Sequence, residues 1–85
     1  MPKVEIYTSS SCGYCTRAKS LLTQKGVAFH EVDVSRDQGA RQAMMQSANG
    51  AYTVPQIFIG GRHIGGCDDL HALEQAGRLG GLLAG

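Results

Sequence analysis

The sequence lacks both a strong charge of one sign and a long apolar run. Its 85 residues carry a net charge of +1, and 18% of them are charged. Nucleic acids and anionic membranes select for clustered Lys and Arg, so neither is expected as the main partner. No run approaches the ~18 apolar residues of a membrane span, and the N-terminal stretch MPKVEIYTSS lacks the apolar core of a secretory signal. We therefore expect a cytoplasmic protein.

Cysteine is scarce as well, with three residues in all. An odd count without dense spacing is not typical of a secreted disulfide scaffold, and structural disulfides are rare in a reducing compartment. The close pair Cys12 and Cys15 is therefore interpreted as catalytic or metal-binding. A structural zinc site needs four ligands, usually from a second close pair. Cys67 stands alone, and His63 and His71 are further apart than the usual spacing of three to five residues. A dedicated zinc site is therefore not expected.

The sequence also has no internal repeat, linker or low-complexity segment. A chain this short has room for one hydrophobic core, so residues 1–85 are expected to form a single domain. Apolar periodicity and turn residues predict, in order, a strand at 3–8, a helix at 14–25, a strand at 27–34, a helix from Ser35 or Asp37 to about 48, strands at 56–59 and 62–64 joined by Gly60-Gly61, a helix capped by Asp68 or Asp69, and a short helical turn after 77. This order predicts an α/β fold. A parallel βαβ unit and an antiparallel hairpin form a four-stranded mixed sheet, with helices on both faces.

The stretch SCGYC places the close cysteine pair where a strand gives way to a helix. Residues three apart at a helix start share one face, at a Cα separation that a disulfide tolerates. Cys12 at the helix N-terminus has free N–H groups and the positive end of the helix dipole beside it, which stabilise a thiolate. Cys15 shares the apolar stripe of Ala18 and Leu22, and is expected to be a buried thiol that resolves a mixed disulfide on Cys12. Two inert buried thiols are the alternative, which the polar run at 8–11 argues against.

Two further motifs favour a binding site. Pro55 in TVP stands directly before a strand, where it cannot donate to the ladder, and an ordinary trans proline in a turn is the simplest interpretation. The stretch GGCDDL is a turn that opens a helix, so its free amides form a small anion site, and an adjacent carboxylate attracts a cation. A ligand with a carboxylate and an ammonium on one carbon fits this arrangement. Asp68 and Asp69 can equally be helix caps, and Cys67 a small packing residue.

A strand leading into TSSSCGYC, followed by TVPQIFI and GGCDDL in this order and spacing, closely resembles the glutaredoxin family of the thioredoxin superfamily, above all its small bacterial members. The resemblance covers essentially the whole chain. It implies a thioredoxin-like fold and a glutathione-dependent thiol-disulfide oxidoreductase. Such an enzyme reduces protein disulfides, low-molecular-weight disulfides and glutathione mixed disulfides through Cys12 and Cys15. We expect a monomer whose partners are glutathione and disulfide-containing or glutathionylated proteins. Ribonucleotide reductase is a target that only the resemblance suggests.

The resemblance also implies which residues hold glutathione. Pro55 is then cis and faces the redox cysteines, so that Val54 offers its N–H and C=O to an extended peptide. The amides of Cys67 and Asp68 hold the γ-glutamyl carboxylate, Asp68 holds the ammonium, and Tyr14 packs against the bound tripeptide. The predicted set is Tyr14, Thr53, Val54, Pro55, Gly66, Cys67 and Asp68.

Two departures from the family pattern stand beside these matches. Ser9 occupies the place where members commonly have a lysine for the glycine carboxylate of glutathione, and Arg41 and Gln56 are the predicted substitutes. Gly13 replaces the common proline, and the resemblance implies that such variants can hold a [2Fe-2S] cluster between two protomers through Cys12 and glutathione. A cluster carrier is therefore the alternative function. An enzyme reduced by thioredoxin reductase is a third hypothesis, against which TVP and CDD argue.

Overall fold

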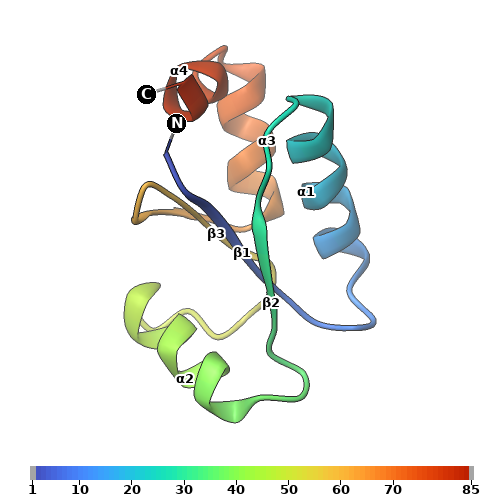
Figure 1. The fold of residues 1–85 in the computed structure, drawn as a ribbon, viewed down its shortest axis with the longest axis vertical. Helices are drawn as coiled ribbons and strands as arrows, with labels where there is room; N and C mark the ends of the chain where they lie inside the picture. Colours follow the sequence, from blue (N-terminus) through green and yellow to red (C-terminus); the bar gives the residue numbers. More distant parts are fainter. Residues whose placement is uncertain (1, 85) are drawn as a thin grey trace.

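A four-stranded sheet forms the centre of the molecule (Figure 1). The computed structural model describes residues 2–84. Its elements are β1 (Val4–Thr8), α1 (Gly13–Gln24), β2 (His30–Asp33), α2 (Gln38–Ser47), β3 (Gln56–Ile59), β4 (Arg62–Gly65), α3 (Cys67–Gln75) and α4 (Leu79–Ala84). The strand order is β2-β1-β3-β4, with β1 and β2 parallel and the other neighbours antiparallel. The predicted βαβ unit and its hairpin extension are confirmed.

The two faces of the sheet bury different residues. Val4 and Ile6 alternate with Tyr7 along β1, so they point to opposite faces. On the first face, α1 and α3 cover the main core, whose buried members are Val4, Ile6, Ala18, Leu21, Leu22, Ile57, Ile59, Cys67, Leu70, Leu79 and Leu83. On the second face, Tyr7 meets Phe58 edge to face with ring centroids 5.7 Å apart. Figure 1 shows α2 alone on this side of the sheet.

The start of α2 is one of the two that the sequence predicts, whereas the N-cap residue of α3 corrects the prediction. α2 begins after Asp37, whose carboxylate accepts the Ala40 N–H at 3.0 Å, and not at Ser35. The N-cap residue of α3 is Gly66 and neither of the two predicted aspartates. Asp69 still helps to cap this helix, because its side chain reaches back from the first turn and accepts the Gly66 N–H at 3.0 Å.

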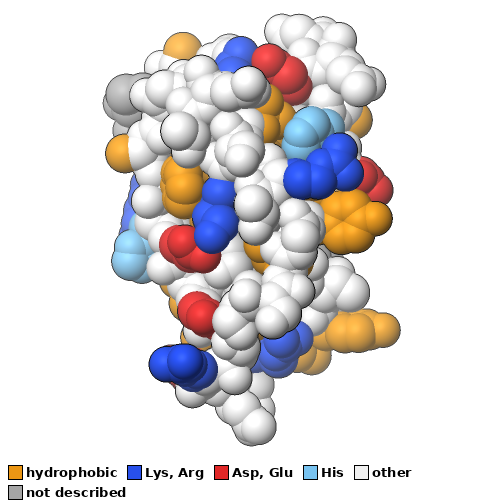
Figure 2. Space-filling view, turned by 90° about the vertical axis from the view of Figure 1, so that its right-hand side faces the viewer, with side chains coloured by type: hydrophobic (Ala, Val, Ile, Leu, Met, Phe, Trp, Pro, Cys, Tyr) orange, Lys and Arg blue, Asp and Glu red, His pale blue; other side chains and the backbone are white. Residues whose placement is uncertain are grey.

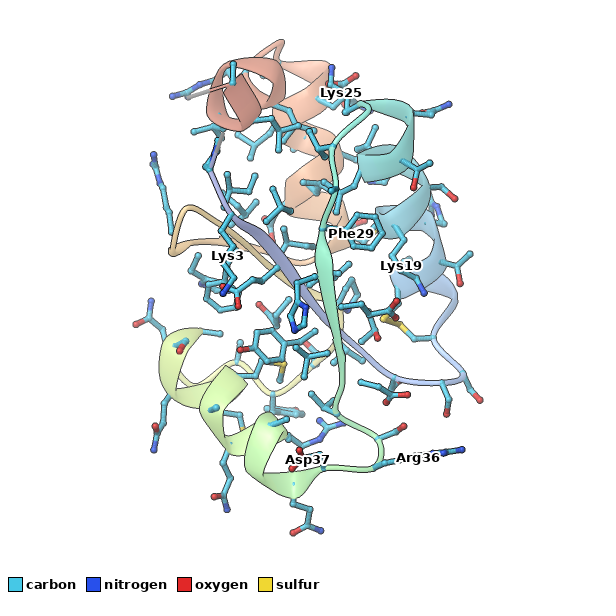
Figure 3. The ribbon with its side chains drawn as sticks, viewed as in Figure 1. Lys3, Lys19, Lys25, Phe29, Arg36 and Asp37 are labelled. Carbon is cyan, nitrogen blue, oxygen red and sulfur yellow. A yellow bond between two sulfur atoms is a disulfide. The ribbon has the colours of Figure 1, made fainter. Side chains whose placement is uncertain are left out.

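The second strand is shorter than the sequence predicts. Only His30–Asp33 pairs with β1, and not the whole range 27–34. The Val27 N–H bonds to the Leu22 carbonyl at the end of α1, so the segment starts against the helix and not against the sheet. Val27 and Phe29 pack on the core, and Figure 3 shows Phe29 between β2 and α1.

The glycine-rich tail forms α4, as predicted, and buries Leu79 and Leu83. Among residues 2–84, no helix is both long and apolar enough to cross a bilayer. On the face seen in Figure 2, acidic and basic side chains are interspersed, so this face carries no continuous patch of one sign.

Candidate active site

Cys12 and Cys15 lie at the start of α1 and are joined by a disulfide. Cys12 is the N-cap residue with extended backbone, Cys15 stands in the first turn, and their Cα atoms are 5.2 Å apart. The N–H of Cys15 donates to Sγ of Cys12 at 3.1 Å. Cys15 is 1% exposed, whereas Cys12 is partly exposed. One sulfur is therefore accessible and the other is buried, as the helical stripe predicts.

The loop of residues 51–55 faces this pair. The Val54 carbonyl oxygen lies 3.7 Å from Sγ of Cys12. The peptide bond between Val54 and Pro55 is cis, as the resemblance implies. Sγ carries no proton in the disulfide, so the approach is a contact and not a hydrogen bond. The backbone of Val54 thus lies next to the accessible sulfur.

A groove of about 330 Å³ separates this loop from β4 and the start of α3. Its lining residues are Tyr14, Ala51, Thr53, Val54, Pro55, Gln56, His63, Gly65, Gly66, Cys67, Asp68 and Asp69. The groove brings together every predicted glutathione contact except Arg41. The sequence does not single out Ala51 and His63 as lining residues, and it marks Gly65 and Asp69 only as parts of the GGCDDL turn.

Two glycines let α3 start close to the loop. Gly65 has a φ of +119°, and the Asp69 carboxylate occupies the space that a Cβ at Gly65 would need. The Pro55 carbonyl oxygen lies 3.4 Å from the place of a Cβ at Gly66. Asp69, predicted as a helix cap, stands three positions after the N-cap residue Gly66, which is the position from which an acidic side chain can reach back to the cap. No local signal marks His63.

The first turn of α3 presents backbone amides and two exposed carboxylates to the groove. The N–H groups of Cys67 and Asp68 stand where the helix itself supplies no acceptor. Asp68 and Asp69 are both exposed, and the Asp69 carboxylate already accepts the Gly66 N–H. The side chain of Cys67 is 4% exposed and belongs to the core, and burial raises the pKa of its thiol. Cys67 therefore offers an amide to the groove and a neutral thiol to the interior.

The two predicted substitutes for the family lysine hold the loop itself. Nη1 of Arg41 donates to the Tyr52 carbonyl at 2.8 Å, from outside the groove lining. Gln56 is 4% exposed, and its Nε2 donates to the Thr53 carbonyl at 3.1 Å. Consecutive carbonyls of the loop are thus bonded by side chains of α2 and β3.

A second groove of about 330 Å³ lies beside the redox pair. It is lined by Thr8, Ser9, Ser10, Ser11, Cys12, Gly13, Cys15, Thr16, Lys19, Glu31 and Asp33. Glu31 accepts hydrogen bonds from Thr8 Oγ1 at 2.7 Å and Lys19 Nζ at 3.0 Å, and these bonds lower the pKa of its carboxyl group. Figure 3 shows Lys19 on α1 next to β2. We call this the hydroxyl groove.

Comparisons with known proteins identify the family. The glutaredoxin family profile matches residues 4–64, and the chain is 54% identical to a glutaredoxin of Pseudomonas aeruginosa over 84 residues, 99% of each chain. The chain belongs to the glutaredoxin family. It is also 52% identical to glutaredoxin 3 of Escherichia coli K12 over 83 residues, 98% of this chain and 99% of that one.

A solved structure supports the same conclusion. The crystal structure of a buckwheat glutaredoxin–glutathione complex matches with a TM-score of 0.88 at 34% identity, covering 98% of this chain and 77% of that one. The predicted thioredoxin-like fold is confirmed. As a glutaredoxin with a Cys12–Cys15 disulfide, the protein is a dithiol member and a glutathione-dependent thiol-disulfide oxidoreductase.

Proposed function

We propose that Cys12 is the attacking thiolate of this glutaredoxin and that the groove beside Val54 binds glutathione. One observation carries the proposal: Sγ of Cys12 lies 3.1 Å from the N–H of Cys15 and 3.7 Å from the Val54 carbonyl oxygen. In the reduced protein the N–H and the helix dipole stabilise a thiolate. The Val54 backbone offers an edge to the peptide that becomes attached to this sulfur.

With a glutathionylated protein, the Cys12 thiolate attacks the sulfur of glutathione in the mixed disulfide. The bond between the two substrate sulfurs breaks, a disulfide forms between Cys12 and glutathione, and the protein leaves as a thiolate that takes a proton from water. A second glutathione, as thiolate, attacks the glutathione sulfur of this adduct. Glutathione disulfide leaves and the Cys12 thiolate returns, so this route does not use Cys15.

With a protein disulfide, Cys15 resolves the adduct. Cys12 attacks one substrate sulfur, and Cys15 then loses its proton and attacks Cys12, so that the substrate leaves as a dithiol. The resulting Cys12–Cys15 disulfide is reduced by two glutathione molecules, which become glutathione disulfide. The Cα separation of 5.2 Å supports this step, because it lies within the range that a disulfide spans.

Backbone groups make most of the proposed glutathione contacts. The cysteinyl residue of glutathione pairs with the N–H and C=O of Val54 as an added strand would. The amides of Cys67 and Asp68 receive the γ-glutamyl carboxylate, and the Asp68 carboxylate takes the ammonium. Tyr14, which is 58% exposed, packs against the tripeptide. The groove wall is completed by Thr53, Pro55 and Gly66.

Two cysteine substitutions separate the two routes. Cys12→Ser should reduce turnover of a glutathionylated peptide and of a protein disulfide to background, because the attacking sulfur is gone. Cys15→Ser should keep the first activity and lose the second. Ser20→Ala, at an exposed position of α1, is the control and should keep both. Full turnover by Cys12→Ser, measured with glutathione and glutathione reductase, would contradict the proposal. The same assay of the unchanged protein, with thioredoxin reductase in place of glutathione and glutathione reductase, tests the alternative reductant.

An iron-sulfur carrier is the second candidate, and Gly13 is the residue that favours it. A Cβ at Gly13 would meet no atom within 4 Å, so the surface beside Cys12 is open. Within residues 2–84 no three His, Cys, Asp or Glu side chains gather to hold a metal ion. A [2Fe-2S] cargo would therefore need Cys12 from two protomers and two glutathione thiols. Anaerobic reconstitution with visible absorption and gel filtration tests this, and a colourless monomer would refute it.

We also propose that the protein acts as a monomer in the cytoplasm. Dependence on glutathione as reductant supports a reducing compartment. The proposed substrates are disulfide-containing and glutathionylated proteins, with ribonucleotide reductase suggested by family resemblance. Gel filtration of the protein without reconstitution tests the monomer.

A further inference from the structure

A chain of hydrogen bonds runs from β4 through Gln56 to the loop 51–55. Nε2 of Gln56 donates to the Thr53 carbonyl at 3.1 Å, and Oε1 of Gln56 lies 2.6 Å from Nε2 of His63. Because the amide nitrogen of Gln56 faces a carbonyl, the amide oxygen faces His63. His63 must therefore donate from Nε2. The Thr53 carbonyl oxygen can only accept a hydrogen bond. It therefore fixes the orientation of the Gln56 amide, which in turn makes His63 the donor.

Packing holds both side chains of this hydrogen-bond chain in place. Gln56 is 4% exposed, and its nitrogen also lies 3.4 Å from the hydroxyl of Thr53. The ring of His63 packs on Phe58, with centroids 5.1 Å apart. A buried amide bonded at both ends has a single favourable orientation. To bind a carboxylate of glutathione directly, Gln56 would have to turn at least one of its two N–H groups away from Thr53.

We propose that Gln56 and His63 are positioning residues that set the backbone of Thr53 and Val54 opposite Cys12. This inference rests on the proposed glutathione groove and replaces the direct contact predicted for Gln56. The carbonyl that Gln56 binds belongs to the residue directly before Val54, whose own carbonyl oxygen lies 3.7 Å from Sγ of Cys12. A loop that shifts at Thr53 therefore moves the groups that pair with glutathione. Arg41 bonds the preceding carbonyl, that of Tyr52, from α2.

Two single substitutions and their combination test the chain. Gln56→Met keeps the side-chain length and removes both bonds, whereas His63→Phe keeps a ring on Phe58 and removes only the donor. Each should weaken binding of S-methylglutathione, an unreactive probe, about three- to tenfold, the range of one lost hydrogen bond. The double variant should bind no more weakly than Gln56→Met alone, because both act through one chain. KM for a glutathionylated peptide should rise while kcat stays unchanged.

His63→Gln restores an N–H donor and should recover most of the affinity for S-methylglutathione.

The matched controls are Gln46→Met and His30→Phe, at exposed positions, which should bind the probe as the unchanged protein does. The Val54 amide resonance of the free protein gives a readout that needs no glutathione. Gln56→Met and His63→Phe should both move it, and the controls should not. The proposal is overturned if His63→Phe leaves the affinity and this resonance unchanged, or if the two losses multiply in the double variant. The unchanged protein could fail to bind S-methylglutathione while the Val54 amide resonance still moves in Gln56→Met and His63→Phe. The assignment of the groove to glutathione would then be wrong, and the positioning of the loop by Gln56 and His63 would stand.

Discussion

The two grooves beside the redox pair differ in the contacts that hold them in place. At the proposed glutathione groove several contacts involve the backbone: the Val54 carbonyl lies beside Cys12, the Gly66 N–H donates to Asp69, and Gly65 has a φ of +119°. At the hydroxyl groove the contacts join side chains, because Thr8 and Lys19 both donate to Glu31. The fold gives each backbone group one position, whereas exposed side chains exchange among rotamers. Substitutions that disturb the backbone of the first groove should therefore matter most, and changes in the second should matter least.

The largest effect is expected for Gly65→Ala. The substitution forces a side chain into a positive-φ position and against the Asp69 carboxylate. Strained backbone of this kind costs about 1–3 kcal/mol, and the clash with Asp69 adds to it. Urea denaturation should therefore show a clearly lower midpoint, and S-methylglutathione should bind more weakly. Gly80→Ala is the control, since it lies within α4 with nothing within 4 Å of a new Cβ. Gly80→Ala should keep or raise the urea midpoint. Equal midpoints for Gly65→Ala and Gly80→Ala would contradict the view that the backbone at Gly65 is constrained.

An intermediate effect is expected for Asp68→Asn, the one side-chain charge proposed to hold glutathione. Loss of an exposed charged partner should raise KM for a glutathionylated peptide about three- to tenfold, with kcat unchanged. A peptide carrying glutathione without its amino group is the chemical control. The two proteins should turn it over with the same KM. A KM ratio that is the same for both substrates would show that Asp68 does not contact the ammonium.

The smallest effect is expected for Glu31→Gln in the hydroxyl groove. Hydrogen bonds from Thr8 and Lys19 lower the pKa of Glu31 in the folded state. The resulting stability is complete above the ordinary pKa of Glu and is lost as the pH falls through the lowered value. The side chains of Lys19 and Glu31 are 32% and 39% exposed, so the contribution should be small. Glu31→Gln and Lys19→Met should each flatten the fall in urea midpoint that occurs as the pH drops below the ordinary pKa of Glu. A fall as steep as that of the unchanged protein would contradict this assignment. Turnover at neutral pH should not change.

The parts of the fold that could be predicted are those determined by residues close together in the sequence. The α1 stripe of Cys15, Ala18 and Leu22 is buried as its spacing predicts, and the hairpin forms at Gly60-Gly61, both with positive φ. The extent of β2 could not be predicted in the same way. Its start depends on where the chain leaves α1 and on the register with β1, which periodicity does not contain.

The same division holds at the active site. Cys12 and Cys15 are recognisable because the geometry of the pair follows from its spacing at a helix start. The bonds from Gln56 to His63 and from Arg41 to Tyr52 join segments that meet only in the folded chain. The β3–β4 pairing also shifts register between Ile57 and Phe58, which strand alternation alone does not reveal.

The most direct test is the glutathione adduct of Cys15→Ser, studied by mass spectrometry and amide NMR. We expect one glutathione attached at Cys12. The amide resonances of Val54, Cys67 and Asp68 should move, while those of Lys19 and Glu31 should stay in place. An adduct on another residue, or resonance changes confined to the hydroxyl groove, would contradict the assignment of the attacking sulfur and its binding groove.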